Sequence, residues 1–94
     1  MFSGKVLVDF YSTTCMPCKK LASDLDDMSK ELQDNYNINI MKFNIEDHYD
    51  LVEKYEVMSV PTLILFKDNE LKGAIVGYMG KDNLKKFIEN AIIA

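Results

Sequence analysis

The 94-residue chain has no tryptophan, only two cysteines and no long hydrophobic run. No stretch approaches the roughly 18 consecutive apolar residues of a membrane-spanning helix, so a transmembrane segment is not expected. Basic residues are also in deficit, with 11 Lys and Arg against 15 Asp and Glu and a net charge of -4. Without a basic cluster there is no surface suited to bind phosphate backbones or anionic lipids, and we expect neither nucleic acid nor a membrane as a partner.

The composition that remains is that of an ordinary folded protein, with 48% hydrophobic and 28% charged residues. We predict a single domain over residues 1–94, because this length supports one hydrophobic core. The N-terminus runs directly into a strand pattern and lacks the features of a secretory signal, which predicts a cytoplasmic protein. Permanent disulfides are rare in the cytoplasm, so a cysteine pair there is expected to be reactive or to bind metal.

Apolar periodicity predicts the element order β-α-β-α-β-β-α. The predicted strands and helices cover residues 6–10, about 18–34, 38–45, 47–55, 62–66, 71–76 and 84–92, the last helix following Gly80. Between the third and fourth strands, Asp68 and Asn69 tolerate the positive φ of a tight turn, which indicates a hairpin. A right-handed crossover makes the first two strands parallel, and the hairpin adds antiparallel strands to the same sheet. The sequence therefore predicts an α/β fold with a mixed four-stranded sheet and three helices.

Cys15 and Cys18 form a Cys-x-x-Cys pair at the start of the first predicted helix. This spacing places one sulfur at the exposed tip and the other one turn inside, close enough to form a reversible disulfide. Cys18 shares a helical face with Ala22 and Leu25 and should be sheltered, whereas Cys15 precedes Pro17 and faces solvent. Because a helix N-terminus stabilises a thiolate, we expect Cys15 to attack and Cys18 to resolve.

A zinc half-site and an inert pair of core thiols are the alternative interpretations of this motif. Structural zinc usually takes four protein ligands, and the chain has no second cysteine pair. His48 lies at the start of a short predicted helix, where we assign it no role. The motif therefore favours redox chemistry, with no metal and no cofactor other than the Cys15–Cys18 disulfide itself.

Several short segments occur in the order and spacing of thioredoxin: Val8–Tyr11, Cys15–Lys19, Lys42–Ile45, Val60–Leu63, Phe66–Lys67 and Val76–Gly77. The chain resembles the thioredoxin family over nearly its whole length, which implies the three-layer thioredoxin fold. The resemblance also implies that Pro61 is a cis proline beside the cysteines and that Val60 offers its backbone to an extended substrate segment. Gly77 and Tyr78 would line the same groove, although Gly77 could equally be a bulge in the last strand.

By the same resemblance, Asp9 and Lys42 match a buried carboxylate and a lysine that the family places behind the resolving cysteine. A carboxylate there can take the proton from Cys18 before Cys18 attacks the mixed disulfide. The alternative is a buried Asp9–Lys42 ion pair without a catalytic role. We favour catalysis, because a charge in a central strand is costly.

The chain departs from the family pattern in three ways. Thr14 and Tyr11 stand where the family has tryptophans, so part of the aromatic surface beside the site is lost. Met16 replaces the usual glycine between the cysteines and adds a flexible apolar side chain at the contact surface. Thr14 and Met16 are therefore expected to contact substrate and to alter its selection. The chain also starts where the family's second strand starts, which predicts a sheet without the first strand and helix.

The leading functional hypothesis is an electron carrier that reduces protein disulfides and is recharged by a thioredoxin reductase or a similar donor. A glutathione-coupled or more oxidising relative is a second hypothesis, although glutaredoxins usually have proline directly after the first cysteine, whereas Pro17 precedes the second. A third is a binding module in which the cysteines are incidental. The strand over residues 38–45 is an open edge with several polar side chains, so we expect a monomer.

Overall fold

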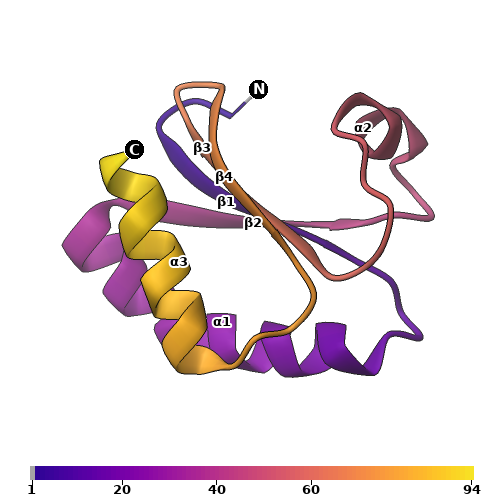
Figure 1. Cartoon of the computed structure of the whole chain (residues 1–94), viewed down its shortest axis with the longest axis horizontal. Helices are drawn as coiled ribbons and strands as arrows, with labels where there is room; N and C mark the ends of the chain where they lie inside the picture. The colour runs from indigo at the N-terminus through magenta and orange to yellow at the C-terminus, as the bar shows by residue number, and fades with distance from the viewer. Residues whose placement is uncertain (1) are drawn as a thin grey trace.

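The computed structural model describes residues 2–94 and contains seven elements in the predicted order. The strands are β1 (Lys5–Tyr11), β2 (Ile38–Asn44), β3 (Thr62–Lys67) and β4 (Glu70–Val76), and the helices are α1 (Met16–Tyr36), α2 (Tyr49–Lys54) and α3 (Lys81–Ile93). Figure 1 shows α1 and α3 together on one face of the sheet and α2 on the other. The predicted α/β fold, with three layers and a mixed sheet, is confirmed.

The sheet has the strand order β2-β1-β3-β4, which places β1 in its interior and β2 at one edge. β1 runs parallel to β2, with Asp9 opposite Lys42, and antiparallel to β3, with Asp9 opposite Leu63. β3 and β4 form the predicted hairpin. Its turn uses Asp68 and Asn69 at φ 51° and 69°, a conformation that these two residue types adopt more readily than most.

Two apolar clusters hold the layers together on opposite faces of the sheet. One joins α1 and α3 to the sheet through fully buried leucines and isoleucines, among them Leu7, Leu25 and Ile88. The other packs α2 through Leu51 against aromatic side chains that include Phe10. Alternation along β1 supplies both clusters, so this strand is buried on both faces and its carboxyl end carries Asp9 into the interior.

α1 is longer than its predicted range of 18–34, because both of its ends are capped by residues outside the apolar pattern. Cys15 is the N-cap, and its Sγ accepts a hydrogen bond from the backbone N–H of Cys18 at 3.1 Å. Asn37 closes the other end with φ 57°, donating its backbone N–H to the carbonyl of Gln33 at 3.1 Å. The helix therefore starts at the first cysteine and presents Cys18 in its first turn.

α2 is shorter than its predicted range of 47–55. A turn at Asn44 precedes the helix, where the Asn44 side chain accepts from the N–H of Glu46 at 3.0 Å. After the helix, Glu56 takes φ 54° and the chain turns back, with the N–H of Val57 donating to the carbonyl of Val52 at 2.9 Å. Within residues 2–94, no helix combines the length and apolarity needed to cross a membrane.

Candidate active site at the start of helix α1

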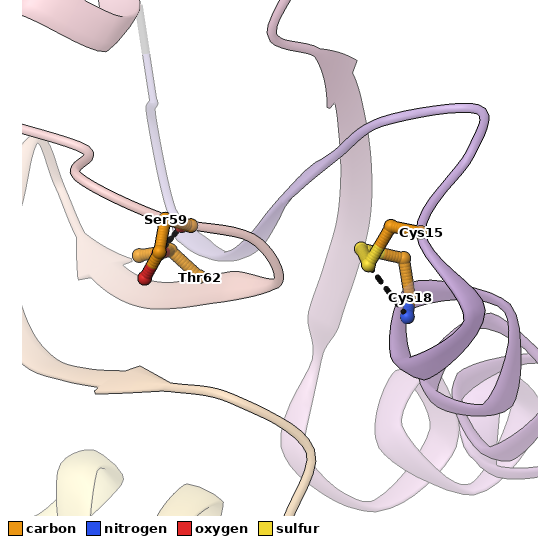
Figure 2. The surroundings of a disulfide bond; sticks show 4 residues. All are labelled: Cys15, Cys18, Ser59 and Thr62. Carbon is orange, nitrogen blue, oxygen red and sulfur yellow. Dashed lines mark hydrogen bonds between the residues drawn. A yellow bond between two sulfur atoms is a disulfide. The ribbon is translucent and has the colours of Figure 1, made fainter.

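The two cysteines are joined by a disulfide at the N-terminus of α1, with their Cα atoms 5.2 Å apart (Figure 2). Cys18 is 3% exposed, whereas Cys15 is partly exposed, which is the predicted asymmetry between the two sulfurs. The first turn of α1 contains no acidic residue. The positive end of the helix dipole and the free N–H groups therefore act on Cys15 with no opposing charge in that turn, and they would stabilise its thiolate in the reduced state.

Behind the disulfide lies a cavity of about 330 Å³ whose lining includes Asp9, Cys18, Lys42 and Tyr11. Asp9 is 1% exposed, and neither of its carboxylate oxygens has a hydrogen-bond partner among the described residues. Burial raises the pKa of Asp9 to about 6, an effect that the positive charge of Lys42 partly opposes. Asp9 can therefore gain or lose a proton near neutral pH beside the buried cysteine.

The alternative of a buried Asp9–Lys42 ion pair is wrong. The two residues are register partners on neighbouring strands, but the Lys42 ammonium bonds Asp26 of α1 at 3.3 Å instead. The side chains of Lys42 and Asp26 are 37% and 73% exposed, so this pair stays in contact with water. Taking the ammonium into the interior would add a desolvation penalty, and the long lysine side chain allows its charge to remain at the surface.

A second cavity of about 290 Å³ lies on the other side of the cysteine motif and is lined by Met16, Pro17, Lys20, Val60, Pro61, Gly77 and Tyr78. We call these seven residues the groove. The Val60–Pro61 bond is cis, as the family resemblance implied. The turn that contains this bond is closed by the Thr62 hydroxyl, which donates to the carbonyl of Ser59 at 2.6 Å (Figure 2).

Gly77 is not a bulge, since it follows the end of β4 and the irregular register of the hairpin lies at Leu65 and Phe66. It takes φ 91° and donates its N–H to the carbonyl of Pro61 at 2.8 Å, which ties the chain after β4 to the cis proline. Five of the six residues expected to bind substrate line this groove together. Thr14 is exposed and lines neither cavity.

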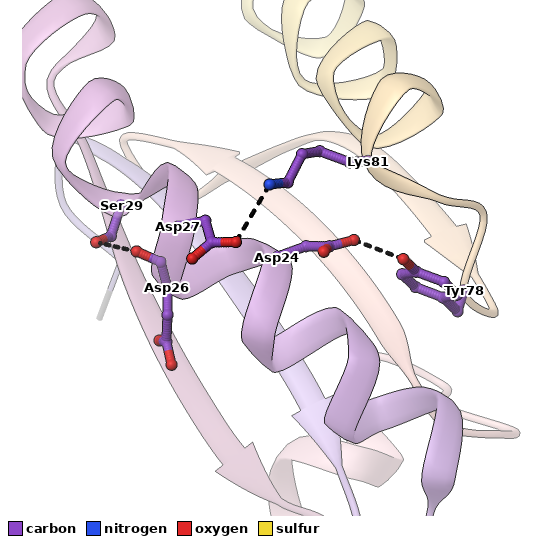
Figure 3. A network of polar contacts seen from close by, with 6 residues as sticks. All are labelled: Asp24, Asp26, Asp27, Ser29, Tyr78 and Lys81. Carbon is purple, nitrogen blue, oxygen red and sulfur yellow. Dashed lines mark hydrogen bonds and ion pairs between the residues drawn. The ribbon is translucent and has the colours of Figure 1, made fainter.

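Sequence reasoning missed the polar contacts that join α1 to the chain beyond β4. The Tyr78 hydroxyl donates to Asp24 at 2.6 Å, and Lys81 pairs with Asp27 at 3.2 Å (Figure 3). The partners in each contact are 54 residues apart, so no local pattern could have paired them. Among residues 2–94, no three His, Cys, Asp or Glu side chains come together as a metal site.

The arrangement can be compared with known proteins. A family model described as thioredoxin matches residues 2–90. The thioredoxin of Staphylococcus saprophyticus is 41% identical over 87 residues, which are 93% of this chain and 82% of that protein. A thioredoxin of Staphylococcus aureus is 38% identical over the same shares.

Among solved structures, oxidised mitochondrial thioredoxin 3 of Saccharomyces cerevisiae superposes with a TM-score of 0.79 at 29% identity. The match covers 93% of this chain and 79% of the yeast chain. The four-stranded sheet with its three helices is thus a thioredoxin fold, and the cysteine pair lies at the start of α1 within the matched region. From the family match and the Cys15–Cys18 disulfide together, we conclude that the chain belongs to the thioredoxin family of thiol–disulfide oxidoreductases.

Proposed function

We propose that the chain reduces disulfide bonds in other proteins by dithiol–disulfide exchange through Cys15 and Cys18. The observation that carries this proposal is the disulfide at a helix N-terminus, with one partly exposed and one buried sulfur, between a buried carboxylate and an open groove. An inert structural disulfide would need neither the asymmetry nor the groove. Exchange chemistry uses both.

The reaction starts from the reduced chain, in which Cys15 is a thiolate. Its sulfur attacks one sulfur of the substrate disulfide, forming a mixed disulfide and releasing the other substrate sulfur as a thiolate, which takes a proton from water. The Cys18 thiol then loses its proton and attacks the Cys15 sulfur, which forms the Cys15–Cys18 disulfide and releases the second substrate thiolate. Two electrons pass from the cysteine pair to the substrate, and the chain ends in the oxidised state of the structure.

Asp9 is the group we assign to receive the proton of Cys18. Both residues line the same cavity, and the carboxylate makes no hydrogen bond to the described residues that would occupy its oxygens. A pKa of about 6 leaves Asp9 largely ionised at neutral pH yet basic enough to accept a proton transiently. Lys42 would modulate this step through its charge rather than through contact with the carboxylate.

The groove is where we place the substrate segment that carries the disulfide. Met16 is 62% exposed beside Cys15, and Val60 and Pro61 contribute further apolar surface. An extended peptide there would bring its cysteine to the Cys15 sulfur while its neighbouring side chains contact Met16 and Tyr78. Thr14, exposed directly before Cys15, would contact the substrate on the outer side of the motif.

The oxidised chain must be reduced again before another turnover. We assign this role to a protein electron donor of the thioredoxin reductase kind, acting in a reducing compartment such as the cytoplasm, where protein disulfides are substrates rather than stable structures. No bound cofactor is required for the exchange itself.

The proposal is tested by following insulin reduction with a thioredoxin reductase and NADPH, and in parallel with glutathione and glutathione reductase. We expect turnover with the protein donor, and none from a variant that carries Cys15→Ser and Cys18→Ser. An Asp34→Ala variant, which changes an exposed α1 carboxylate away from both cavities, should retain wild-type turnover. Turnover with glutathione alone would instead assign the chain to glutathione-coupled exchange.

A further inference from the structure

Tyr78 is a groove residue whose hydroxyl bonds a residue of α1 that is not part of the groove lining. It donates to Asp24 Oδ2 at 2.6 Å, and Figure 3 shows the two side chains meeting end to end between α1 and the segment before α3. The hydrogen bond to Asp24 raises the pKa of the Tyr78 phenol, so the hydroxyl remains a donor through the neutral range. Tyr78 is 37% exposed and lines the groove.

The backbone around Tyr78 does little to fix its side chain. Gly77 and Gly80 enclose the segment at φ 91° and 86°, and a Cβ at either position would meet nothing within 4 Å. Gly77 is anchored to Pro61 by one backbone hydrogen bond, but a backbone anchor leaves the Tyr78 ring free to rotate about its side-chain torsions. Among the described residues, the hydrogen bond to Asp24 is the side-chain hydrogen bond that favours one orientation of the ring.

α1 presents the acceptors for this contact on the face that also borders the groove. Lys20, Asp24 and Asp27 follow one another at helical spacings of four and three, so they lie on one side of α1. Lys20 lines the groove, Asp24 holds Tyr78, and Asp27 bonds Lys81 at the first residue of α3. The exposed Asp27–Lys81 pair is weak alone, but it joins the same two parts of the chain one turn further along.

We propose that Asp24 is a positioning residue that holds the Tyr78 ring as an apolar wall of the groove, and that this wall favours protein disulfides flanked by an apolar side chain. The inference rests on the proposed function, since it concerns selection among substrates of the same exchange reaction. With its hydroxyl engaged by Asp24, Tyr78 offers the groove its ring. Among the described residues that line the groove, Lys20 is the one ionised side chain, so a basic residue beside the substrate cysteine is disfavoured.

The test compares two disulfide-linked peptides that differ only in a leucine or a lysine next to the cysteine, together with a small aromatic disulfide. Tyr78→Phe keeps the ring and removes the donor, and Asp24→Ala removes the acceptor. Each should raise KM for the leucine peptide by about three- to tenfold, the size expected for one net hydrogen bond. The preference for the leucine peptide over the lysine peptide should therefore fall, while kcat changes less than KM.

Asp24→Asn provides the rescue, because its side-chain oxygen still accepts from the Tyr78 hydroxyl, and it should keep most of the wild-type preference. Asp34→Ala is the matched control for a lost α1 carboxylate and should leave the preference unchanged. Wild-type preference in both Tyr78→Phe and Asp24→Ala, with the small disulfide still reduced, would overturn the positioning role alone. A wild-type chain that reduces none of the three disulfides would overturn the proposed function, and this inference with it.

Discussion

Cys15 and Cys18 are only three residues apart, yet the helix N-terminus gives them different surroundings. Cys15 is partly exposed in front of the first turn of α1, while Cys18 is 3% exposed inside it. The helix dipole and free N–H groups favour the thiolate at Cys15, and burial disfavours a thiolate at Cys18. From these surroundings we expect Cys15 to attack a substrate disulfide and Cys18 to resolve the mixed disulfide.

We expect brief iodoacetamide treatment of the reduced chain to alkylate Cys15 before Cys18, as mapped by mass spectrometry of the digested protein. The reason is that Cys15 has both the accessible sulfur and the stabilised thiolate. A Cys18→Ser variant should accumulate mixed disulfides with substrates, because nothing resolves them, whereas Cys15→Ser should not. Faster labelling of Cys18 would reverse the assignment of the two roles.

Ionisation of the buried Asp9 carboxyl lowers the free energy of unfolding. Its folded-state pKa of about 6 lies above the ordinary 3.8, so the folded chain binds more protons than the unfolded chain between these values. The free energy of unfolding therefore falls as pH rises from about 4 to above 6. Relative to Asp9→Asn, the wild type should lose about 2–3 kcal/mol between pH 4 and 7.5. Urea unfolding of both proteins at the two pH values measures this, and parallel pH profiles would refute it.

The same Asp9→Asn change should slow the second step of the exchange. Without a proton acceptor beside Cys18, resolution of a preformed mixed disulfide should fall about tenfold or more, since general base catalysis commonly contributes about 10²–10⁴-fold. Stopped-flow release of a chromophoric substrate thiol measures the step, with Asp34→Ala as control. Unchanged resolution at pH 7 would show that Asp9 is not the acceptor.

The sequence predicted some of these residue environments and not others, for a physical reason. Burial of Asp9 followed from the apolar run around it in a central strand. The pairing of Lys42 with Asp26 could not be predicted from the sequence. The partner of a long lysine side chain depends on distances in the folded chain and on which partner leaves the ammonium in contact with water. Tyr78 and Asp24 likewise meet only after the fold brings distant segments together.

At the scale of elements, α3 docks closely on β4 because one strand residue lacks a side chain. A Cβ at Gly73 would lie 3.1 Å from the Cβ of Ala91 and 3.2 Å from Cε1 of Phe87, and both of these residues belong to α3. Both contacts are shorter than ordinary van der Waals packing. Ala91 and Phe87 would each have to shift by a few tenths of an ångström to admit a side chain at position 73.

We therefore expect Gly73→Val to lower the free energy of unfolding by about 1–3 kcal/mol through overpacking, despite the better strand propensity of valine. Ala74→Val is the matched control, since Ala74 is the next residue of β4 and is exposed. Chemical denaturation of the two variants and the wild type makes the comparison. Equal stability of Gly73→Val and Ala74→Val would show that α3 accommodates the added volume without cost.

Element boundaries were predicted less well than element types because end positions depend on single capping residues. The apolar stripe of α1 indicates where its buried face lies, but Cys15 and Asn37 decide where the helix starts and stops. For α2, a turn at Asn44 and the left-handed Glu56 shorten the helix at both sides. By contrast, the hairpin turn at Asp68 and Asn69 was predictable, since those residue types carry their own conformational preference.

At the scale of the whole molecule, the order of elements alone determined most of the topology. A β-α-β start followed by a hairpin leaves few ways to build one sheet, and the handedness of the crossover puts α1 on one face of it. The candidate active site then lies where the carboxyl end of β1 meets the start of α1, with the β3 entry and the chain after β4 beside it. The cysteine motif alone does not predict that these four segments of the chain meet.

The last prediction concerns β2, which pairs only with β1 within residues 2–94 and so leaves one strand edge open. An open edge invites pairing with a second chain, and charged or polar side chains along it discourage this. Asn39 and Lys42 are exposed on β2 and serve that purpose, so we expect the 94-residue chain to sediment as a monomer at micromolar concentrations. Asn39→Val should increase self-association with rising concentration in sedimentation velocity runs, whereas Asp34→Ala should not. A stable wild-type dimer whose contact runs through residues 38–45 would show that these side chains do not protect the edge.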